Sequence, residues 1–489
     1  MLRFFLKKIT IIYKHKYTIV CFFLISVFYF FIQGKSVSGH AISNEARYIK
    51  QDETWNGTIS ILDDTVIEEN ATLNINAGTK IIFYISSPLN PPRIIVKGKL
   101  LVNGKKEEKV LFTSSQEAIL NPVEEEEKNS ISKTIINFFA KKKSSEIKLW
   151  GGIHFDKIGE NGSIVSYSII EFAKDGIVLL NSSPSITFST IRNCGQSGIR
   201  CNLRSNPRII SNVFEKNSYS GIYCHQESFP EISNNFFKGL SCGIYCYQSA
   251  PKIIANNIFE KNQKGIYCGL PGASTDITGN KFTDNENGIF CEQSASPIIE
   301  RNIFFNNKHA IYCQRLASPN IVENEFNKNE YAVFCFQNSS PLINNNKFTF
   351  NKIGIYLKYA SYPNINKNFL DESNDYAVKI DKQSHYLYQE LMFNTSGKYR
   401  MGRGAYSPEK QEKRDEKFKF NKQKKFEGIN TTINAKNNYW GEKVTKEMIK
   451  NKKNVNIKTI WDGFDEPEFE FEGKKYPQDK VDYSEWLDK

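Results

Sequence analysis

The sequence predicts an all-β fold, a parallel β-helix in which short strands coil around one axis and successive coils stack. Three observations predict it. A small residue followed by Ile or Val recurs every 22 or 23 residues, a polar residue precedes it at a nearly fixed distance, and prolines mark a third place in the unit. The small residues are Gly176, Gly198, Gly221, Gly243, Gly265, Gly288, Ala310, Ala332, Gly354 and Ala377.

Each unit contains runs of three to five β-forming residues separated by Asn, Gly, Ser and Pro, which is the punctuation of strands and turns. The unit is too short to bury its apolar side chains except under identical neighbours. We therefore expect a solenoid whose equivalent residues stack about 4.8 Å apart.

Composition excludes several classes of protein. The chain has 489 residues, of which 13% are aromatic and 24% charged, so it has enough apolar surface to fold and is not wholly disordered. It contains one long apolar run, which excludes a polytopic membrane protein. The formal net charge is +12, and five of the excess positive charges precede that run.

The N-terminal residues 1–41 are expected to direct export. Thr18 to Ile32 is an uncharged apolar run that follows a basic segment and precedes small polar residues. The run is short for a membrane span, which favours a cleaved signal peptide, whereas its aromatic content favours a membrane anchor. Both readings stay open, and both place the remaining chain outside the cytoplasm, in the periplasm, at the cell surface or held at the membrane.

The polar position of the repeat is predicted to form an asparagine ladder. Stacked amides can hydrogen-bond along the axis and tolerate tight turns, so the role is structural. The series comprises Ser168, Thr190, Asn212, Asn235, Asn257, Asn280, Asn302, Asn324, Asn346 and Asn368. A second, less regular series comprises Asn217, Asn262, Asn285, Asn307, Asn329 and Asn351.

Seven of the ten cysteines share one repeat position, which Leu357 and Ile380 occupy in later coils. Exchange with Leu and Ile predicts an interior column of free thiols, with disulfides between coils and metal binding as the alternatives. The histidines are scattered and no paired zinc motif is present, so no metal site is expected. The seven are Cys201, Cys224, Cys246, Cys268, Cys291, Cys313 and Cys335.

One residue before these cysteines runs a row of aromatic side chains, which strand alternation places on the outside. The row is the candidate ligand-binding site, a platform on which sugar rings could stack. The alternative is that aromatic residues simply suit β-sheets and that a terminal or inserted segment covers them. The row comprises Tyr223, Tyr245, Tyr267, Phe290, Tyr312, Phe334 and Tyr356.

The flanking segments carry a family resemblance. Strand-like runs between Thr58 and Phe155, and the segments Ile433 to Gly441 and Ile460 to Pro467, frame the repeats. Together they resemble the exported right-handed parallel β-helix repeat proteins of the pectate-lyase-like superfamily. The resemblance implies a right-handed coil, an N-terminal cap and a C-terminal closing segment. It implies no single activity, since the superfamily contains polysaccharide-active enzymes, adhesins and copper-enzyme accessory proteins.

The predicted organisation follows from these segments. It comprises residues 1–41 as signal or anchor, 42–116 as cap and first coils, 117–148 as a charged insertion, 149–382 as β-helix repeats, 383–428 as a basic insertion, and 429–489 as the C-terminal coil and cap. The basic insertion contains 11 Lys and Arg residues against 6 acids. Both insertions are expected to be loops on one face of the solenoid.

No catalytic residues can be named from the sequence. Polysaccharide cleavage needs paired carboxylates, or an acid cluster for calcium with a base, on adjacent coils. Glu215 and Glu260 share a position but Lys238 intervenes, and Glu323 follows Arg301 as in a salt bridge between coils. Asp63 and Asp64 lie in the cap.

The sequence therefore favours an exported binding and scaffold module over an enzyme, with a polysaccharide or cell-surface component as partner. The alternative is a polysaccharide lyase, hydrolase or epimerase. Neither a cofactor nor a nucleic-acid partner is expected, and calcium would be bound only under the enzyme alternative. Contact with the membrane is expected only through the N-terminal segment.

Overall fold

The computed structural model describes residues 46–115, 147–270, 275–371, 374–384, 386–387, 432–451 and 455–487. These residues belong to one compact unit that begins at Ala46. The predicted signal or anchor at 1–41, nearly all of the insertion at 117–148 and most of the insertion at 383–428 lie outside the described residues. In the described part of the chain, no helix has the length and apolar character needed to cross a bilayer.

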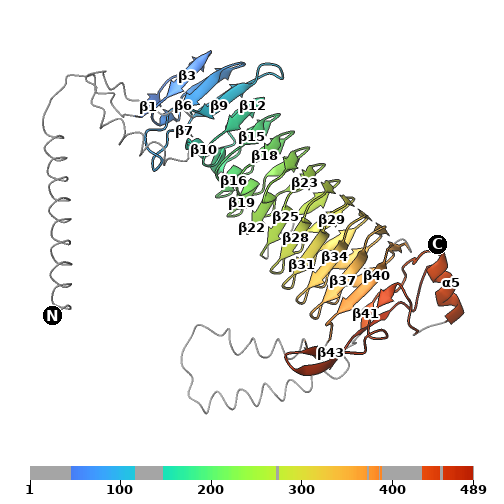
Figure 1. Ribbon diagram of the computed structural model, residues 1–489. Helices are drawn as coiled ribbons and strands as arrows, with labels where there is room; N and C mark the ends of the chain where they lie inside the picture. The colour runs from blue at the N-terminus through green and yellow to red at the C-terminus, as the bar shows by residue number, and fades with distance from the viewer. Residues whose placement is uncertain are drawn as a thin grey trace, which may run out of the picture. The chain divides into compact units, whose positions relative to one another are not determined.

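The described residues form a solenoid in which each coil contributes one strand to each of three parallel sheets (Figure 1). The parallel β-helix predicted from the repeat is confirmed. Sheet A has 15 strands and sheets B and C have 13 each. Neighbouring strands in these sheets are three elements apart along the chain, except for β40 and β42 at the C-terminal end of sheet A, since the chain passes through all three sheets before it returns.

Sheet A contains β1 (Arg47–Ile49), β4 (Thr65–Ile67), β7 (Arg93–Val96), β10 (Gly152–Gly159), β13 (Ile177–Ser182), β16 (Ser197–Asn202), β19 (Ser220–His225), β22 (Cys242–Tyr247), β25 (Lys264–Gly269), β28 (Asn287–Glu292), β31 (His309–Gln314), β34 (Tyr331–Phe336), β37 (Ile353–Lys358), β40 (Tyr376–Asp381) and β42 (Ile460–Trp461).

Sheet B contains β2 (Glu53–Trp55), β5 (Thr72–Asn76), β8 (Lys99–Asn103), β11 (Ile164–Ser166), β14 (Ser185–Thr187), β17 (Arg208–Ile210), β20 (Glu231–Ser233), β23 (Ile253–Ala255), β26 (Asp276–Thr278), β29 (Ile298–Glu300), β32 (Asn320–Val322), β35 (Leu342–Asn344) and β38 (Asn364–Asn366).

Sheet C contains β3 (Thr58–Ile61), β6 (Lys80–Phe83), β9 (Val110–Ser114), β12 (Ser168–Glu171), β15 (Thr190–Arg192), β18 (Val213–Glu215), β21 (Phe236–Lys238), β24 (Ile258–Glu260), β27 (Lys281–Thr283), β30 (Ile303–Phe305), β33 (Glu325–Asn327), β36 (Lys347–Thr349) and β39 (Phe369–Leu370).

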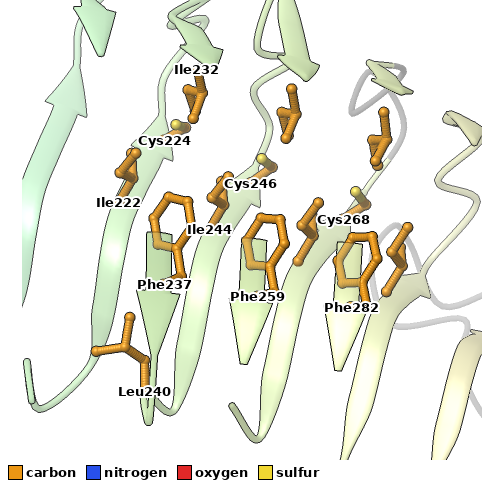
Figure 2. Packing of buried hydrophobic residues seen from close by; sticks show 14 of the residues in the cluster. Ile222, Cys224, Ile232, Phe237, Leu240, Ile244, Cys246, Phe259, Cys268 and Phe282 are labelled. Atoms are coloured by element: carbon orange, nitrogen blue, oxygen red, sulfur yellow. The ribbon is translucent and has the colours of Figure 1, made fainter. Parts of the chain in front are cut away.

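The core is a set of stacked columns, each built from the same residue type in successive coils (Figure 2). Sheet A supplies an isoleucine column and the cysteine column, sheet B supplies isoleucines, and sheet C supplies phenylalanines, all with 0% exposure over the central coils. Parallel in-register pairing produces the columns, for example Phe237 with Phe259 in sheet C. Their ring centroids lie 4.8 Å apart, so each ring is covered by its neighbours.

The recurring small residue is explained by this packing. A Cβ atom added at Gly243 would lie 2.8 Å from a ring carbon of Phe259 and 2.5 Å from the carbonyl oxygen of Gly265. This packing therefore favours Gly near the start of each sheet A strand, and in the coils where Ala310, Ala332 and Ala377 occupy the position the neighbouring groups must give way to the methyl group.

The asparagine ladder is confirmed, and it does more than join amides. The side-chain oxygen of Asn280 accepts hydrogen bonds from the backbone N–H of Asn257 at 2.9 Å and from its amide at 3.0 Å. The Asn280 amide in turn donates to the carbonyl of Ile254 at 2.9 Å and to Asn302 at 3.0 Å. Each ladder residue thus satisfies buried backbone groups of the preceding coils, which would otherwise be costly to bury.

Two details of the ladder prediction are wrong. Thr190 does not belong to the series, because Ser189 occupies the ladder position and its N–H donates to Asn212. The ladder residues also do not adopt the tight-turn backbone themselves. The residue just before each one does, as at Asn256 with φ 55° before Asn257. The ladder side chain must point inward, so the left-handed turn falls on its exposed neighbour.

The nine described cysteines are free and buried, as the interior thiol column requires. Cys224, Cys246 and Cys268 lie one above another on β19, β22 and β25 (Figure 2).

The C-terminal segment closes the last coil. β41 (Thr432–Asn434) pairs with β45 (Lys480–Asp482), and Asn438 accepts the last ladder bonds from Asn368. Helix α5 (Glu442–Asn451) packs Val444 and Met448 into the core, and the hairpin of β43 (Glu468–Phe471) and β44 (Lys474–Pro477) follows.

Candidate functional site

The predicted aromatic row lies on the outer face of sheet A. Its members occupy β19, β22, β25, β28, β31, β34 and β37, one per coil, and in-register pairing aligns them in a single column. On each strand the residues before and after the row member point inward, as Ile222 and Cys224 do around Tyr223. Most members are half-buried, and Tyr267 is buried with 7% exposure.

The rings of the row stack on one another along the solenoid axis. Centroid separations run from 4.4 Å between Tyr245 and Tyr267 to 5.8 Å between Tyr267 and Phe290. Interplanar angles reach 16° at most, except between Phe334 and Tyr356, where the angle is 53°. Because neighbouring rings cover one another's faces, the row presents ring edges and hydroxyl groups to solvent. It is not a set of open faces on which sugars could stack.

Two further columns flank the row on the same face. The first, three residues before the row, contains Ser220, Cys242, Lys264, Asn287, His309, Tyr331 and Ile353. The second, two residues after the row, contains His225, Tyr247, Gly269, Glu292, Gln314, Phe336 and Lys358. Sequence reasoning missed both columns. Strand alternation from the row would have found the second, two residues away, but would have placed the first, three residues away, on the inner face.

At the centre of the face, an ion pair is coupled to the row. The ring of Tyr267 leans over Gly269, and its hydroxyl donates to Glu292 at 3.0 Å. Arg315 binds the same carboxylate at 2.7 Å. Burial, followed by the charge of Glu292, raises the pKa of Tyr267, so this hydroxyl stays protonated. The Lys264 amine lies 5.2 Å from the centroid of Phe290, where the stack is most open.

Charged groups end the row on both sides. At the N-terminal end the guanidinium of Arg200 lies 4.8 Å from the centroid of Tyr223, and Asp175 holds it at 3.1 Å. At the C-terminal end the hydroxyl of Tyr356 donates to Asp381 at 2.7 Å, and Lys358 pairs with the same carboxylate at 2.8 Å. Both ends therefore place ion pairs, rather than open ring faces, beside the row.

His309 in the first flanking column is held neutral. Burial is the main cause, followed by the charge of Lys308, and together they lower the pKa of His309 to about 4. Its ring stacks on Tyr331 with 5.1 Å between centroids and meets Phe334 edge-on. The imidazole therefore acts as an uncharged aromatic group at neutral pH.

The C-terminal hairpin extends the aromatic face at one edge. Phe336 contacts Tyr359, and Tyr359 contacts Phe471 of β43 with 5.8 Å between centroids. The hairpin thus reaches the second flanking column and not the row itself, as far as the ring contacts of the described residues go.

Several carboxylates elsewhere on the solenoid are paired with cations of neighbouring coils. Lys238 binds Glu260 at 3.2 Å, which is the intervening lysine expected from the sequence. Arg301 binds Glu323 at 2.9 Å, as predicted. Asp64 of the N-terminal acidic pair binds Arg93 at 2.6 Å. Such ladder pairs neutralise the acids of these columns in place.

Family models match two overlapping parts of the chain. Residues 127–315 match the model described as "Periplasmic copper-binding protein (NosD)", and residues 269–396 match the model described as "Right handed beta helix region". No curated protein matches the sequence.

The thiols of the described residues are poorly suited to bind the copper that this description names. Metal binding needs deprotonated thiols, but burial raises the pKa of Cys335 and raises that of Cys194 to about 12. Within the described ranges, no group of three or more His, Cys, Asp or Glu side chains is placed to hold a metal ion. The described thiols therefore do not fit a copper site.

The solved structures that resemble this chain are distant from it in sequence. The catalytic domain of a GH87 α-1,3-glucanase in complex with tetrasaccharides is 12% identical, with a TM-score of 0.31 over 69% of this chain, and this chain spans 64% of that domain's length. PfbA, a surface adhesin of Streptococcus pneumoniae, is 11% identical, with a TM-score of 0.30 over 67% of this chain and 82% of the adhesin.

The periplasmic alginate epimerase AlgG is likewise 11% identical, with a TM-score of 0.28 over 69% of this chain and 74% of the epimerase. Because the coil repeat, the three parallel sheets and both family models agree, this chain is a right-handed parallel β-helix repeat protein.

Proposed function

We propose that the chain is an exported binding scaffold that holds an extended carbohydrate along the outer face of sheet A. One observation carries the proposal: the row repeats an aromatic side chain in register over seven coils, with several polar side chains in the columns beside it. A linear polymer lying along the axis would meet a ring edge or hydroxyl in every coil, about every 4.8 Å. The basic and apolar N-terminal segment and the periplasmic description of the matching family support export.

The mode of contact follows from the stacking of the rings. Their faces are engaged with each other, so a ligand would be held by phenol hydroxyls, by the Lys264 amine and by the polar groups of the flanking columns. Each such hydrogen bond contributes about 0.5–1.5 kcal/mol. Affinity would therefore build up along the polymer rather than at one pocket.

The test replaces hydroxyls while keeping rings. In the triple variant Tyr223→Phe, Tyr245→Phe and Tyr312→Phe, the stack persists but three hydroxyls are lost. We expect retention of the full-length protein on immobilised polysaccharides to weaken about 10- to 100-fold, with an unchanged melting temperature. Tyr167→Phe, at a turn away from sheet A and stacked on Phe188, is the matched control.

Unchanged retention in the triple variant would contradict binding by the row. The same polysaccharides are followed by mass spectrometry, with and without calcium, because shortened or altered chains would favour the enzyme alternative instead.

A further inference from the structure

The outer face of sheet A carries more basic than acidic side chains. Its strands from β16 to β40 contain four Lys and Arg residues against two acids, namely Arg200, Lys264, Lys358 and Lys379 against Glu292 and Asp381. Both acids are already bound by cations, Glu292 by Arg315 and Asp381 by Lys358, and Asp175 holds Arg200. Among the described residues, no carboxylate pairs with the amines of Lys264 and Lys379, which lie over aromatic rings instead. The face therefore has positive charge to offer a ligand.

Lys264 occupies a partly desolvated place in the first flanking column. Its amine lies 5.2 Å from the ring centroid of Phe290 and 5.9 Å from that of Tyr267. Its neighbours in the column, Cys242 and Asn287, are uncharged and only 4% and 9% exposed. The rings stabilise the cation but do not neutralise it. An anion that reached this amine would gain more than at a fully hydrated lysine, because the surroundings are less polar than water.

The stack of the row is widest beside this amine. The centroids of Tyr245 and Tyr267 lie 4.4 Å apart, whereas those of Tyr267 and Phe290 lie 5.8 Å apart. Gly269 allows Tyr267 to lean, since a Cβ atom at Gly269 would lie 2.6 Å from that ring. Glu292 then holds the hydroxyl of the leaning ring. The widest gap of the row and an amine without an acidic partner thus occur at the same place.

We infer that the glycan held by sheet A is acidic, and that Lys264 binds an anionic group of one sugar unit, a carboxylate or a sulfate ester, beside the gap between Tyr267 and Phe290. The inference rests on the proposed function and adds its ligand class. Burial raises the pKa of Tyr312, so its hydroxyl stays protonated and can donate to anionic oxygens. Lys379 lies five coils further along, about 24 Å away, where the same polymer would present another anionic group.

The test removes one charge and keeps the packing. Lys264→Met retains an unbranched stem over the rings, so the melting temperature should not change, whereas affinity for an acidic glycan should fall about tenfold or more. Lys264→Arg should retain binding. Lys281→Met is the matched control, because Lys281 is exposed on β27 of sheet C and pairs with no carboxylate of the described residues.

The probes are hexagalacturonate, which carries carboxylates, and a sulfated galactan hexasaccharide, each compared with its neutral form, the full methyl ester or the desulfated sugar. They are titrated calorimetrically into the full-length protein at low and high salt. We expect at least one acidic probe to bind about tenfold or more tightly than its neutral form, with an affinity that falls as salt rises. In Lys264→Met this salt dependence should be weaker. The probe that binds tells carboxylate from sulfate.

Equal affinity of an acidic probe for Lys264→Met and the unmodified chain would overturn the inference, as would binding of neither acidic probe. If Lys264→Met melts at a lower temperature, the ratio of the affinities for the acidic and neutral forms decides. Damage to the fold lowers both affinities alike, which would overturn the inference, whereas loss of the charge lowers only the first, which would support it.

The two proposals fail in different ways. Neutral forms bound as tightly as acidic ones, with a loss in the triple Tyr→Phe variant, would leave the proposed function and remove the acidic ligand. Binding of neither the acidic nor the neutral forms would remove both.

Discussion

The interior phenylalanine column of sheet C and the outer aromatic row of sheet A are built by the same strand register, yet they differ in order. Inside, ring centroids lie 4.7–5.0 Å apart and interplanar angles stay between 5° and 13°. Outside, the separations range from 4.4 to 5.8 Å, and one angle reaches 53°.

The difference shows that stacking by itself is a property of the coil spacing. Parallel in-register strands bring equivalent rings together wherever they point. Regularity is added by burial, because close packing leaves an interior ring one orientation. The outer row is irregular around Tyr267 and Tyr356. The hydroxyls of these two residues donate hydrogen bonds to Glu292 and Asp381, and the rings depart from the regular stack there.

The largest effect is expected from opening the interior column. Phe259→Ala leaves a cavity between Phe237 and Phe282 and should lower the free energy of unfolding by about 3–5 kcal/mol. Tyr245→Ala in the outer row should cost about 1–2 kcal/mol, since one edge is already solvated. Guanidinium unfolding midpoints of the two variants measure this. Equal losses would mean that the row is as much a part of the core as the column.

A smaller loss is expected from the asparagine ladder. Asn280→Ala removes the acceptor of a buried backbone N–H and should cost about 2–3 kcal/mol. Asn76→Ala is the control at the surface, where the side-chain amide donates to the exposed Asn56 and the backbone is not left-handed, and it should cost under about 0.5 kcal/mol. Thermal unfolding compares the two. A cost at Asn76 similar to that at Asn280 would contradict the structural role of burial.

The smallest effect concerns pH. The folded state holds the pKa of His309 near 4, below the ordinary value of 6.5, mainly through burial and the nearby Lys308, against the opposing charges of Glu330 and Glu286. The stability of the neutral form is therefore complete above about pH 6.5 and declines as the pH falls toward 4, by about 1–2 kcal/mol.

Asn at this position occurs naturally in the preceding coil, as Asn287, so His309→Asn isolates the effect. The difference in melting temperature between the two proteins should grow in favour of the variant from pH 6.5 to pH 4. His154, whose pKa burial also lowers, contributes equally to both proteins and cancels. A constant difference across this range would refute the assignment.

The fold could be predicted because the interior repeats along a single axis. A position that holds Cys, Leu or Ile in successive coils indicates a core column, and Asn in register indicates a ladder. The rotamers of the outward aromatic side chains could not be predicted from the repeat. Spacing placed Tyr245 outside but could not tell whether its ring would show a face or an edge, since that depends on contacts with Tyr223 and Tyr267.

The asparagine ladder has a direction. Every backbone N–H at this position donates to the side-chain oxygen of the coil that follows, from Asn212 to Asn235 and finally from Asn368 to Asn438. The side-chain amide donates to the same oxygen and also back to a carbonyl of the preceding coil. A coil is thus completed by its successor and remains open until that successor is in place. When the chain is synthesised or exported with its N-terminus first, each coil can be completed only after the next coil has appeared. Asn438 accepts the last bonds of the ladder and so completes the final coil.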